Sequence, residues 1–306
     1  MGQVRTGIES VIEGKRPAID LALTVLLAEG HLLVEDVPGV GKTMLAKALG
    51  RSIDCSVRRL QFTPDLLPSD ITGVAVFNQE SRDFEFKPGG IFANIVVGDE
   101  INRASPKTQS ALLESMEERQ VSVDGTTYLL ELPFMVIATQ NPIEMEGTYP
   151  LPEAQRDRFM ARIAIGYPTP SAELDMLESH GSYDPLAELQ AATDGETIKG
   201  LIEAVKGVYV SPAVRHYLVQ VVNATRNSRD LRLGASPRAT LQLLRASRAW
   251  AALSGRDYVS PDDVAGLATA VLAHRVLPST DAQLARRTVD DVVSQLVTSV
   301  HLPDRR

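Results

Sequence analysis

Residues 31–49 read HLLVEDVPGVGKTMLAKAL, an apolar run followed by a glycine-rich turn and an amphipathic pattern. The apolar run predicts a buried strand at His31–Glu35, and the amphipathic pattern predicts a helix at Thr43–Arg51. The residues between them match the pattern G-x-x-x-x-G-K-[ST] at all but one of its fixed positions. In proteins with this pattern, backbone N–H groups and a helix N-terminus hold phosphate. The departure is Asp36, which stands where this pattern has its first glycine.

The last residues of this turn are the ones expected to contact phosphate and metal. Gly39 and Gly41 let the backbone approach a phosphate, and Lys42 reaches the β- and γ-phosphates of a nucleotide. The Thr43 hydroxyl is a ligand for Mg²⁺. Asp36 starts the turn, a position that mainly needs an unusual backbone angle, which Asp tolerates better than most residues. The nucleotide-binding residues predicted here are Val37, Pro38, Gly39, Val40, Gly41, Lys42, Thr43 and Met44.

Strand and helix patterns alternate up to about Tyr167. This alternation predicts an α/β domain with a mostly parallel, five-stranded sheet that is covered by helices on both faces. The other predicted strands are Val57–Phe62, Ile95–Asp99, Phe134–Thr139 and Ala161–Ile165, and the other predicted helices are Lys15–Ala28 and Lys107–Glu117.

Two β-hairpins interrupt the alternation and look like insertions in a standard core. The first is predicted at Thr72–Lys87, with turn residues Asn78–Asp83. The second is predicted at Gln120–Leu132, where Asp124-Gly125 is a strong turn signal.

The strand signals stop after Tyr167-Pro168-Thr169-Pro170, and Ser171–Ser299 has leucine, alanine and valine at helical spacing. Three helix starts have a serine that can cap the free amides, followed by a proline that suits the first turn: Ser211-Pro212, Ser236-Pro237 and Ser260-Pro261. The sequence therefore predicts a core at residues 1–168 and an all-helical domain at 171–306, with the boundary near Pro168–Ser171.

Composition limits the function classes. The chain has 306 residues, 44% hydrophobic and 23% charged, which is ordinary for a globular protein. Its net charge of -8 argues against nucleic acid as the main partner. The single cysteine, Cys55, excludes an internal disulfide framework and a cysteine-cluster metal site. The sequence has no apolar run long enough to span a membrane, and its first residues, MGQVRTGIESVIEGKRPA, lack a secretory apolar core, so we expect a cytoplasmic protein.

Acidic residues end the strand in IVVGDEIN, Ile95–Asn102. Asp99 there would hold Mg²⁺ through water, and Glu100 would polarise the attacking water; the alternative is a strand that ends in two solvated acids. A later strand, in FMVIATQNP, ends at Gln140-Asn141. A neutral amide at that point can position the lytic water without adding charge, whereas the alternative is an ordinary Asn-Pro turn.

Together these residues resemble an AAA+ ATPase, and more specifically the MoxR family. The similarity covers nearly the whole chain, and an acidic residue at the position of Asp36 is usual in that family. The two hairpins match the helix-2 insert and the hairpin before sensor 1 of this group. The blocks that carry the resemblance are LQFTPDLLPSDITG (Leu60–Gly73), DEINRASPKTQSALLESMEERQV (Asp99–Val121), ATQNPIEMEGTYPLPEAQRDRF (Ala138–Phe159) and GASPRA (Gly234–Ala239).

The resemblance also implies residue roles. Asn141 matches sensor 1, and Arg238, in the first turn of a helix, matches sensor 2. Arg158 matches the arginine finger, which acts on the ATP of a neighbouring subunit, and Arg156 is a rival for that role.

The N-terminal segment SVIEGK resembles the adenine-side segment of the family, so Val11, Ile12 and Gly14 are predicted to line the base pocket. Ordinary apolar packing of a helix is the alternative.

The family resemblance implies ATP hydrolysis with Mg²⁺ in a ring, usually a hexamer, that remodels, assembles or activates a partner. MoxR proteins typically work with a separate von Willebrand factor A domain protein and its client enzyme. A magnesium-chelatase-like motor subunit, a nucleic-acid translocase and a nucleotide-gated scaffold without catalysis are the alternatives. The hairpin tips argue against the translocase, because Ser122–Thr127 has no Lys or Arg and the first tip has only Arg82.

Overall fold

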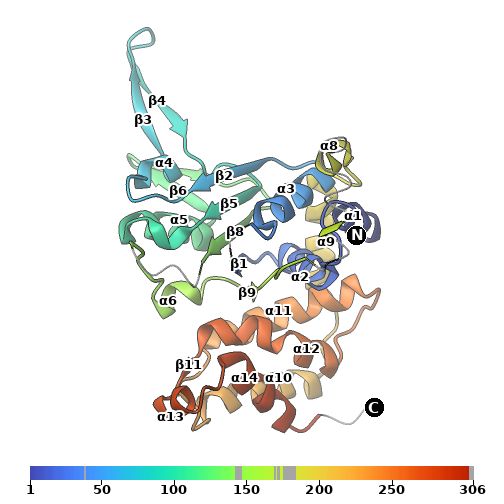
Figure 1. Cartoon of the computed structure of the whole chain (residues 1–306). Coiled ribbons are helices and arrows are strands. Elements are labelled where there is room, and N and C mark those ends of the chain that lie inside the picture. The colour runs from blue at the N-terminus through green and yellow to red at the C-terminus, as the bar shows by residue number, and fades with distance from the viewer. Residues whose placement is uncertain (38, 142–146, 169, 171–172, 175–183, 303–306) are drawn as a thin grey trace. The chain divides into compact units, whose positions relative to one another are not determined.

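The computed structural model describes the chain except for residues 38, 142–146, 169, 171–172, 175–183 and 303–306 (Figure 1). The described chain forms two compact units. Unit 1 comprises Met1–Asp20, His31–Leu151 and Ala164–Lys199, and unit 2 comprises Leu21–Gly30, Pro152–Ile163 and Gly200–Arg306. The predicted domain boundary at Pro168–Ser171 includes residues outside the described part of the chain, and it stays a prediction.

The main sheet has five strands in the order β2-β5-β8-β1-β9. They are β1 (Leu32–Glu35), β2 (Val57–Gln61), β5 (Ile95–Asp99), β8 (Met135–Gln140) and β9 (Ala161–Ile163). The pairs β2–β5, β5–β8 and β1–β8 are parallel. Strands β5, β8 and β1 are almost wholly buried, as expected for runs of Val, Ile and Leu without polar alternation. The five predicted strands are confirmed, with ends that differ by at most two residues.

Helices of unit 1 flank the sheet (Figure 1). Helix α3 (Lys42–Ser52) packs on β2 and β5, and α5 (Pro106–Glu118) packs on α4 (Pro68–Thr72). Helix α5 begins where the Ser105 side chain accepts a hydrogen bond from Thr108 N, with Pro106 in its first turn. The helices predicted from periodicity correspond to α2 (Arg16–Leu27), α3 and α5. The chain also forms α1 (Gly2–Glu9), α8 (Pro185–Glu188) and α9 (Gly195–Lys206), and unit 2 contains the short α6 (Glu153–Arg156).

Both predicted hairpins are confirmed. Strands β3 (Gly73–Asn78) and β4 (Asp83–Pro88) are antiparallel, as are β6 (Gln120–Val123) and β7 (Thr126–Leu129). The β3–β4 hairpin projects beyond the other elements of unit 1 (Figure 1). It exposes large apolar side chains, among them Phe77 at 51% and Phe84 at 68% of their surface.

Unit 2 contains the helices α10 (Pro212–Arg226), α11 (Pro237–Leu253), α12 (Pro261–Leu272) and α14 (Val289–Ser299), which pack on one another. The three predicted serine caps are present: Ser211, Ser236 and Ser260 each accept a hydrogen bond from the backbone N–H three residues later. The predicted helical domain is confirmed, with one short element that the helical pattern did not predict. A two-stranded sheet joins β10 (Leu231–Leu233) to β11 (Leu277–Pro278), and strands this short leave no periodicity in the sequence.

Candidate functional site

The glycine-rich turn connects β1 to the first residue of α3. Gly39 has a φ of 83° and Gly41, which caps α3, has a φ of 91°. Both angles lie in the left-handed region, which an L side chain rarely adopts. The glycines therefore bring the backbone to the N-terminus of α3 in the form that a phosphate site needs. Val37, Val40, Thr43 and Met44 lie in this segment, and Pro38 lies outside the described residues.

Lys42 is the first residue of α3 and is half-buried. Its Nζ donates a hydrogen bond to the backbone carbonyl of Asp36 at 2.5 Å. The ammonium group is thus held over the start of the same turn. The helix N-terminus carries a partial positive charge, and the Lys42 ammonium adds a full one. Together they favour binding of a highly charged anion.

The expected reason for Asp36 was wrong. Asp36 is not among the described residues with a positive φ. Instead its buried carboxylate accepts two backbone hydrogen bonds, from Val37 N to Oδ1 at 2.8 Å and from Gly166 N to Oδ2 at 2.6 Å. Lys15 Nζ holds the same distant segment by donating to the carbonyls of Gly166 and Tyr167. Asp36 therefore connects the turn to a segment 130 residues away.

Replacing Asp36 with alanine is expected to lower the free energy of unfolding by about 1–3 kcal/mol, because two partly buried N–H donors lose their acceptor. Asp36→Asn keeps one carbonyl acceptor and should lose less. Denaturant titration measures both. If Asp36→Gly, which permits any backbone angle, unfolds at the same denaturant concentration as the unchanged chain, the carboxylate bonds contribute nothing and the explanation fails.

Asp99 and Glu100 lie at the carboxyl end of β5. Asp99 Oδ1 accepts from Thr139 Oγ1 at 2.6 Å, and Glu100 N donates to the same hydroxyl at 3.0 Å. Glu100 has a φ of 56°, a left-handed angle that turns the chain directly after the strand. In a strand, successive side chains point to opposite faces of the sheet. The turn at Glu100 interrupts this alternation, and both acids lie at the edge of the sheet.

Three polar residues at this edge were missed by the sequence analysis: Arg59, Gln61 and Thr139. The Arg59 guanidinium donates twice to Asp99 Oδ2, at 3.0 and 2.6 Å. Gln61 Nε2 donates to Glu100 Oε2 at 3.0 Å. Arg59 and Gln61 are two apart on the edge strand β2, so they share a face of the sheet. Because Arg58 is polar too, the spacing of polar residues in β2 does not single out this pair.

The glycine-rich turn and the two acids lie at the same edge of the sheet. Strand β8 lies between β1 and β5, and neighbouring strands are about 4.8 Å apart, which places the two strand ends roughly 10 Å from each other. Gln140, at the end of β8, donates to Glu35 at the end of β1 at 2.5 Å. The next residue, Asn141, is only 6% exposed. Crevices at the carboxyl ends of parallel strands are where α/β folds bind ligands.

The predicted adenine-side residues follow α1. Ile12 is 9% exposed, and Val11 is half-buried. Gly14 has a φ of 71°, and the space where a Cβ would stand is open. This placement fits either apolar packing or a base pocket, so the assignment stays a prediction.

Arg156, Arg158 and Arg238 belong to unit 2. Arg156 is the last residue of α6, and Arg158 lies two residues later. Arg238 lies in the first turn of α11, and all three side chains are half-buried. The roles given to them by resemblance stay predictions.

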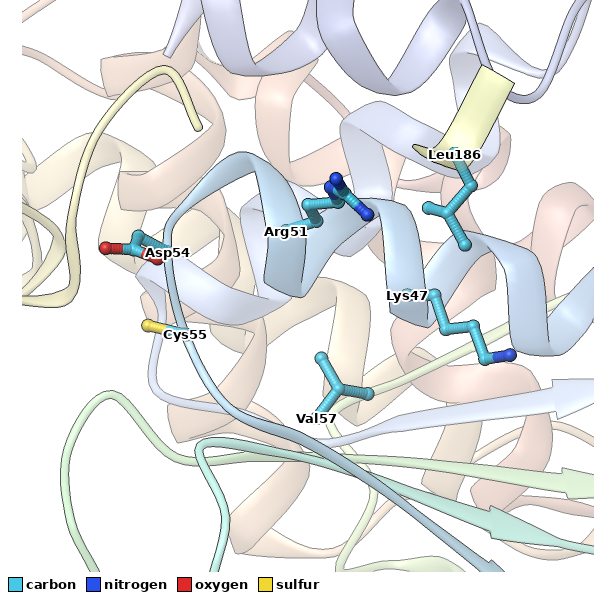
Figure 2. A pocket seen from close by; sticks show the side chains of 6 residues that line it. All are labelled: Lys47, Arg51, Asp54, Cys55, Val57 and Leu186. Atoms are coloured by element: carbon cyan, nitrogen blue, oxygen red, sulfur yellow. The ribbon is translucent and has the colours of Figure 1, made fainter. Parts of the chain in front are cut away.

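A separate pocket of about 380 Å³ lies at the other end of α3 (Figure 2). Its lining residues are Lys47, Arg51, Asp54, Cys55, Val57 and Leu186. Burial, together with the nearby carboxylates, raises the pKa of the Cys55 thiol to about 11. The thiol is therefore protonated near neutral pH and is a poor nucleophile. This pocket is distinct from the glycine-rich turn, because that turn lies at the N-terminus of the helix.

Comparisons with known proteins agree with this geometry. The model of the "ATPase family associated with various cellular activities (AAA)" matches residues 31–161, and that of the "AAA lid domain" matches residues 223–296. Chaperone MoxR1 of Mycobacterium tuberculosis is 41% identical over 97% of this chain and 80% of its own length. The chain belongs to the MoxR family of AAA+ ATPases.

Two further relatives of this MoxR-family chain support the assignment. The Bacillus subtilis protein YeaC is 46% identical over 100% of the chain and 96% of its own length. A crystal structure of a Cytophaga hutchinsonii protein proposed to be an ATPase superimposes with a TM-score of 0.91, at 35% identity over 99% of this chain and 94% of that chain. The fold prediction, an AAA+ core followed by a helical lid, is therefore confirmed.

Proposed function

We propose that this MoxR-family chain hydrolyses ATP with Mg²⁺ and uses the energy to remodel, assemble or activate a partner protein or complex. The observation that carries the proposal is the meeting of the glycine-rich turn with Asp99 and Glu100 at one edge of the sheet. The turn would bind the phosphates, and Glu100 would polarise the attacking water. Asn141 would orient that water from the end of β8.

The residues at the sheet edge fit a magnesium ion that is bound together with a nucleotide. Mg²⁺ usually keeps several waters and takes one or two protein oxygens plus substrate phosphates. Thr43 and Asp99 would supply a hydroxyl and a carboxylate, and no cluster of three or more acidic, His or Cys ligands occurs among the described residues. Asp99 Oδ2 is paired with Arg59, so metal binding through that oxygen would require this guanidinium to move.

The subunits would form a ring, on the family pattern a hexamer, because an arginine finger acts on the ATP of a neighbour. Arg158 would be that finger, with Arg156 as the rival, and Arg238 would contact the phosphates of its own subunit as sensor 2. A guanidinium is suited to both roles, since it stays charged and presents several donors in a fixed plane.

A separate von Willebrand factor A domain protein, together with its client enzyme, is the proposed partner. Support for a protein partner comes from the β3–β4 hairpin, whose exposed side chains include Phe77 and Phe84 rather than a basic cluster. Among the described residues no helix is long and apolar enough to cross a membrane. The proposed site of action is the cytoplasm.

Lys42→Ala is expected to weaken binding of an ATP analogue about 10–100-fold, because hydrogen bonds to charged groups contribute about 1.5–3 kcal/mol. Titration with a fluorescent analogue measures the change. Lys47→Ala is the matched control, since Lys47 lies on the same helix but lines the other pocket. Unchanged affinity in Lys42→Ala would remove the basis for placing the nucleotide at this turn.

A further inference from the structure

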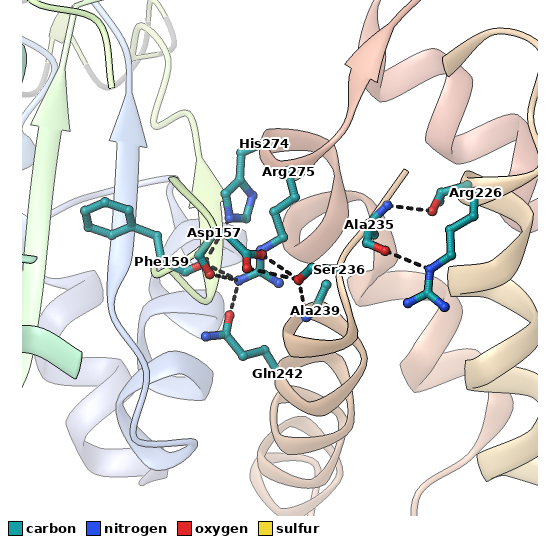
Figure 3. Close-up of polar contacts among 10 residues, drawn as sticks. Asp157, Phe159, Arg226, Ala235, Ser236, Ala239, Gln242, His274 and Arg275 are labelled. Atoms are coloured by element: carbon teal, nitrogen blue, oxygen red, sulfur yellow. Dashed lines mark hydrogen bonds and ion pairs between the residues drawn. The ribbon is translucent and has the colours of Figure 1, made fainter. Parts of the chain in front are cut away.

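A buried polar cluster in unit 2 connects the segment of the candidate finger to the helix of the candidate sensor 2 (Figure 3). Asp157 lies between Arg156 and Arg158 in the sequence. Both of its carboxylate oxygens accept from Ser236 Oγ, at 3.0 and 2.9 Å. Ser236 is the N-cap of α11, the helix that carries Arg238.

The Ser236 hydroxyl serves two bonds at once. It accepts from Ala239 N at 3.3 Å, which caps α11, and it donates to Asp157. A hydroxyl has one donor and two acceptor lone pairs, so the two bonds are compatible. The start of α11 is therefore fixed to Asp157 by the same hydroxyl that caps the first turn of this helix.

Arg275 provides the second link. Its side chain is 1% exposed, and Nε lies 3.3 Å from Asp157 Oδ1. Its Nη2 donates to the carbonyls of Asp157 and Phe159 and to Gln242 Oε1. Gln242 lies on α11, four residues after Arg238, on the same face of that helix. One buried guanidinium thus contacts both the finger segment and the sensor helix.

Arg275 keeps its positive charge although it is buried. Burial lowers the pKa of Arg275 to about 10, the charge of Asp157 opposes that shift, and the charge of Arg238 adds to it. Arg275 therefore stays charged near neutral pH and depends on Asp157 for its partner charge. Phe159, fully buried, anchors the end of the segment, and its carbonyl also accepts from His274 Nε2 at 2.9 Å.

We propose that Asp157, Ser236 and Arg275 are positioning residues that hold the candidate finger segment and the sensor 2 helix as one rigid piece. This inference rests on the proposed function, because the roles of Arg158 and Arg238 belong to it. A movement of α11 that follows the nucleotide of its own subunit would then also move the finger that is presented to the next subunit. Such a connection couples neighbouring sites, since binding at one changes the geometry at the other.

The test uses mixed rings in which only one kind of junction can turn over. Arg158→Ala subunits have an intact nucleotide site but no finger to give, and Lys42→Ala subunits have a finger but no usable site. In their mixture, activity requires the finger of a Lys42→Ala subunit to reach an Arg158→Ala site. Adding Ser236→Ala to the Lys42→Ala subunit then changes only the subunit that supplies the finger, called the donor subunit below. Purification through two affinity tags ensures that the rings are mixed.

Ser211→Ala in the same donor subunit is the matched control. Ser211 caps α10 by accepting from Val214 N at 3.2 Å, so its loss removes an equivalent cap bond without touching Asp157. We expect the Ser236→Ala donor to support about tenfold less turnover than the Ser211→Ala donor, because small displacements of a catalytic group cost large factors in rate. Ser236→Thr, which keeps the hydroxyl, should restore the activity.

The outcomes separate the two proposals. Equal activity with the Ser236→Ala and Ser211→Ala donors, in rings where the parent mixture is active, overturns the positioning role and leaves the proposed function standing. No activity in the parent mixture of Arg158→Ala and Lys42→Ala overturns Arg158 as a finger in trans, and the positioning role of the cluster fails with it. Lower activity with Ser236→Ala alone, restored by Ser236→Thr, supports both.

Discussion

Arg158→Ala is expected to lower ATP turnover per subunit about 10³–10⁵-fold while nucleotide affinity stays near that of the unchanged chain. The reason is charge: the transition state spreads negative charge over the oxygens of the γ-phosphoryl group, and the proposed guanidinium of the neighbouring subunit would neutralise it. In the proposed site, ATP binding rests mainly on the glycine-rich turn and Lys42, which this substitution does not touch.

The dependence on protein concentration gives an independent measurement. Turnover per subunit of the unchanged chain should rise with concentration, since the neighbour completes each site, and Arg158→Ala should abolish that rise. Arg156→Ala is the internal comparison. A large loss in Arg156→Ala together with near-normal turnover in Arg158→Ala would assign the finger to Arg156 instead.

Glu100→Gln is expected to keep ATP affinity and to lower turnover about 10²–10⁴-fold, the range that general acid–base groups contribute. The amide has nearly the shape of the carboxylate but cannot polarise the attacking water. Because binding is retained, the loss should appear in kcat rather than in the affinity for ATP. Turnover near that of the unchanged chain would show that Glu100 is not the activating group.

The same variant offers a route to the partner. A Glu100→Gln ring holds ATP without consuming it, and a pull-down with that form should retain proteins that bind the ATP state. Lys42→Ala, which lacks the phosphate cation, is the control for proteins retained without nucleotide. Recovery of a von Willebrand factor A domain protein with Glu100→Gln and not with Lys42→Ala would support the proposed partner class.

Local patterns predicted much of this chain because their physical basis is local. The need for glycine at positions 39 and 41 follows from their left-handed backbone angles. The serine caps at Ser211, Ser236 and Ser260 bond to an N–H only three residues away. Asp99 ends a buried strand and Glu100 follows it directly, so a sequence window of a few residues places them at the edge of a parallel sheet.

Residue roles that depend on distant partners were decided only by the tertiary structure. Asp36 looked like a residue chosen for its backbone angle, but its carboxylate bonds to Gly166, 130 residues later. Arg59 meets Asp99 across 40 residues, and Ser236 meets Asp157 across 79. A hydrogen bond between remote segments leaves no periodicity in the sequence, because the geometry that forms it exists only after the segments pack. The chain's motifs thus specify its family and its glycine-rich turn, whereas folding determines which side chains hold the acids, the turn and the segment around Arg158 in place.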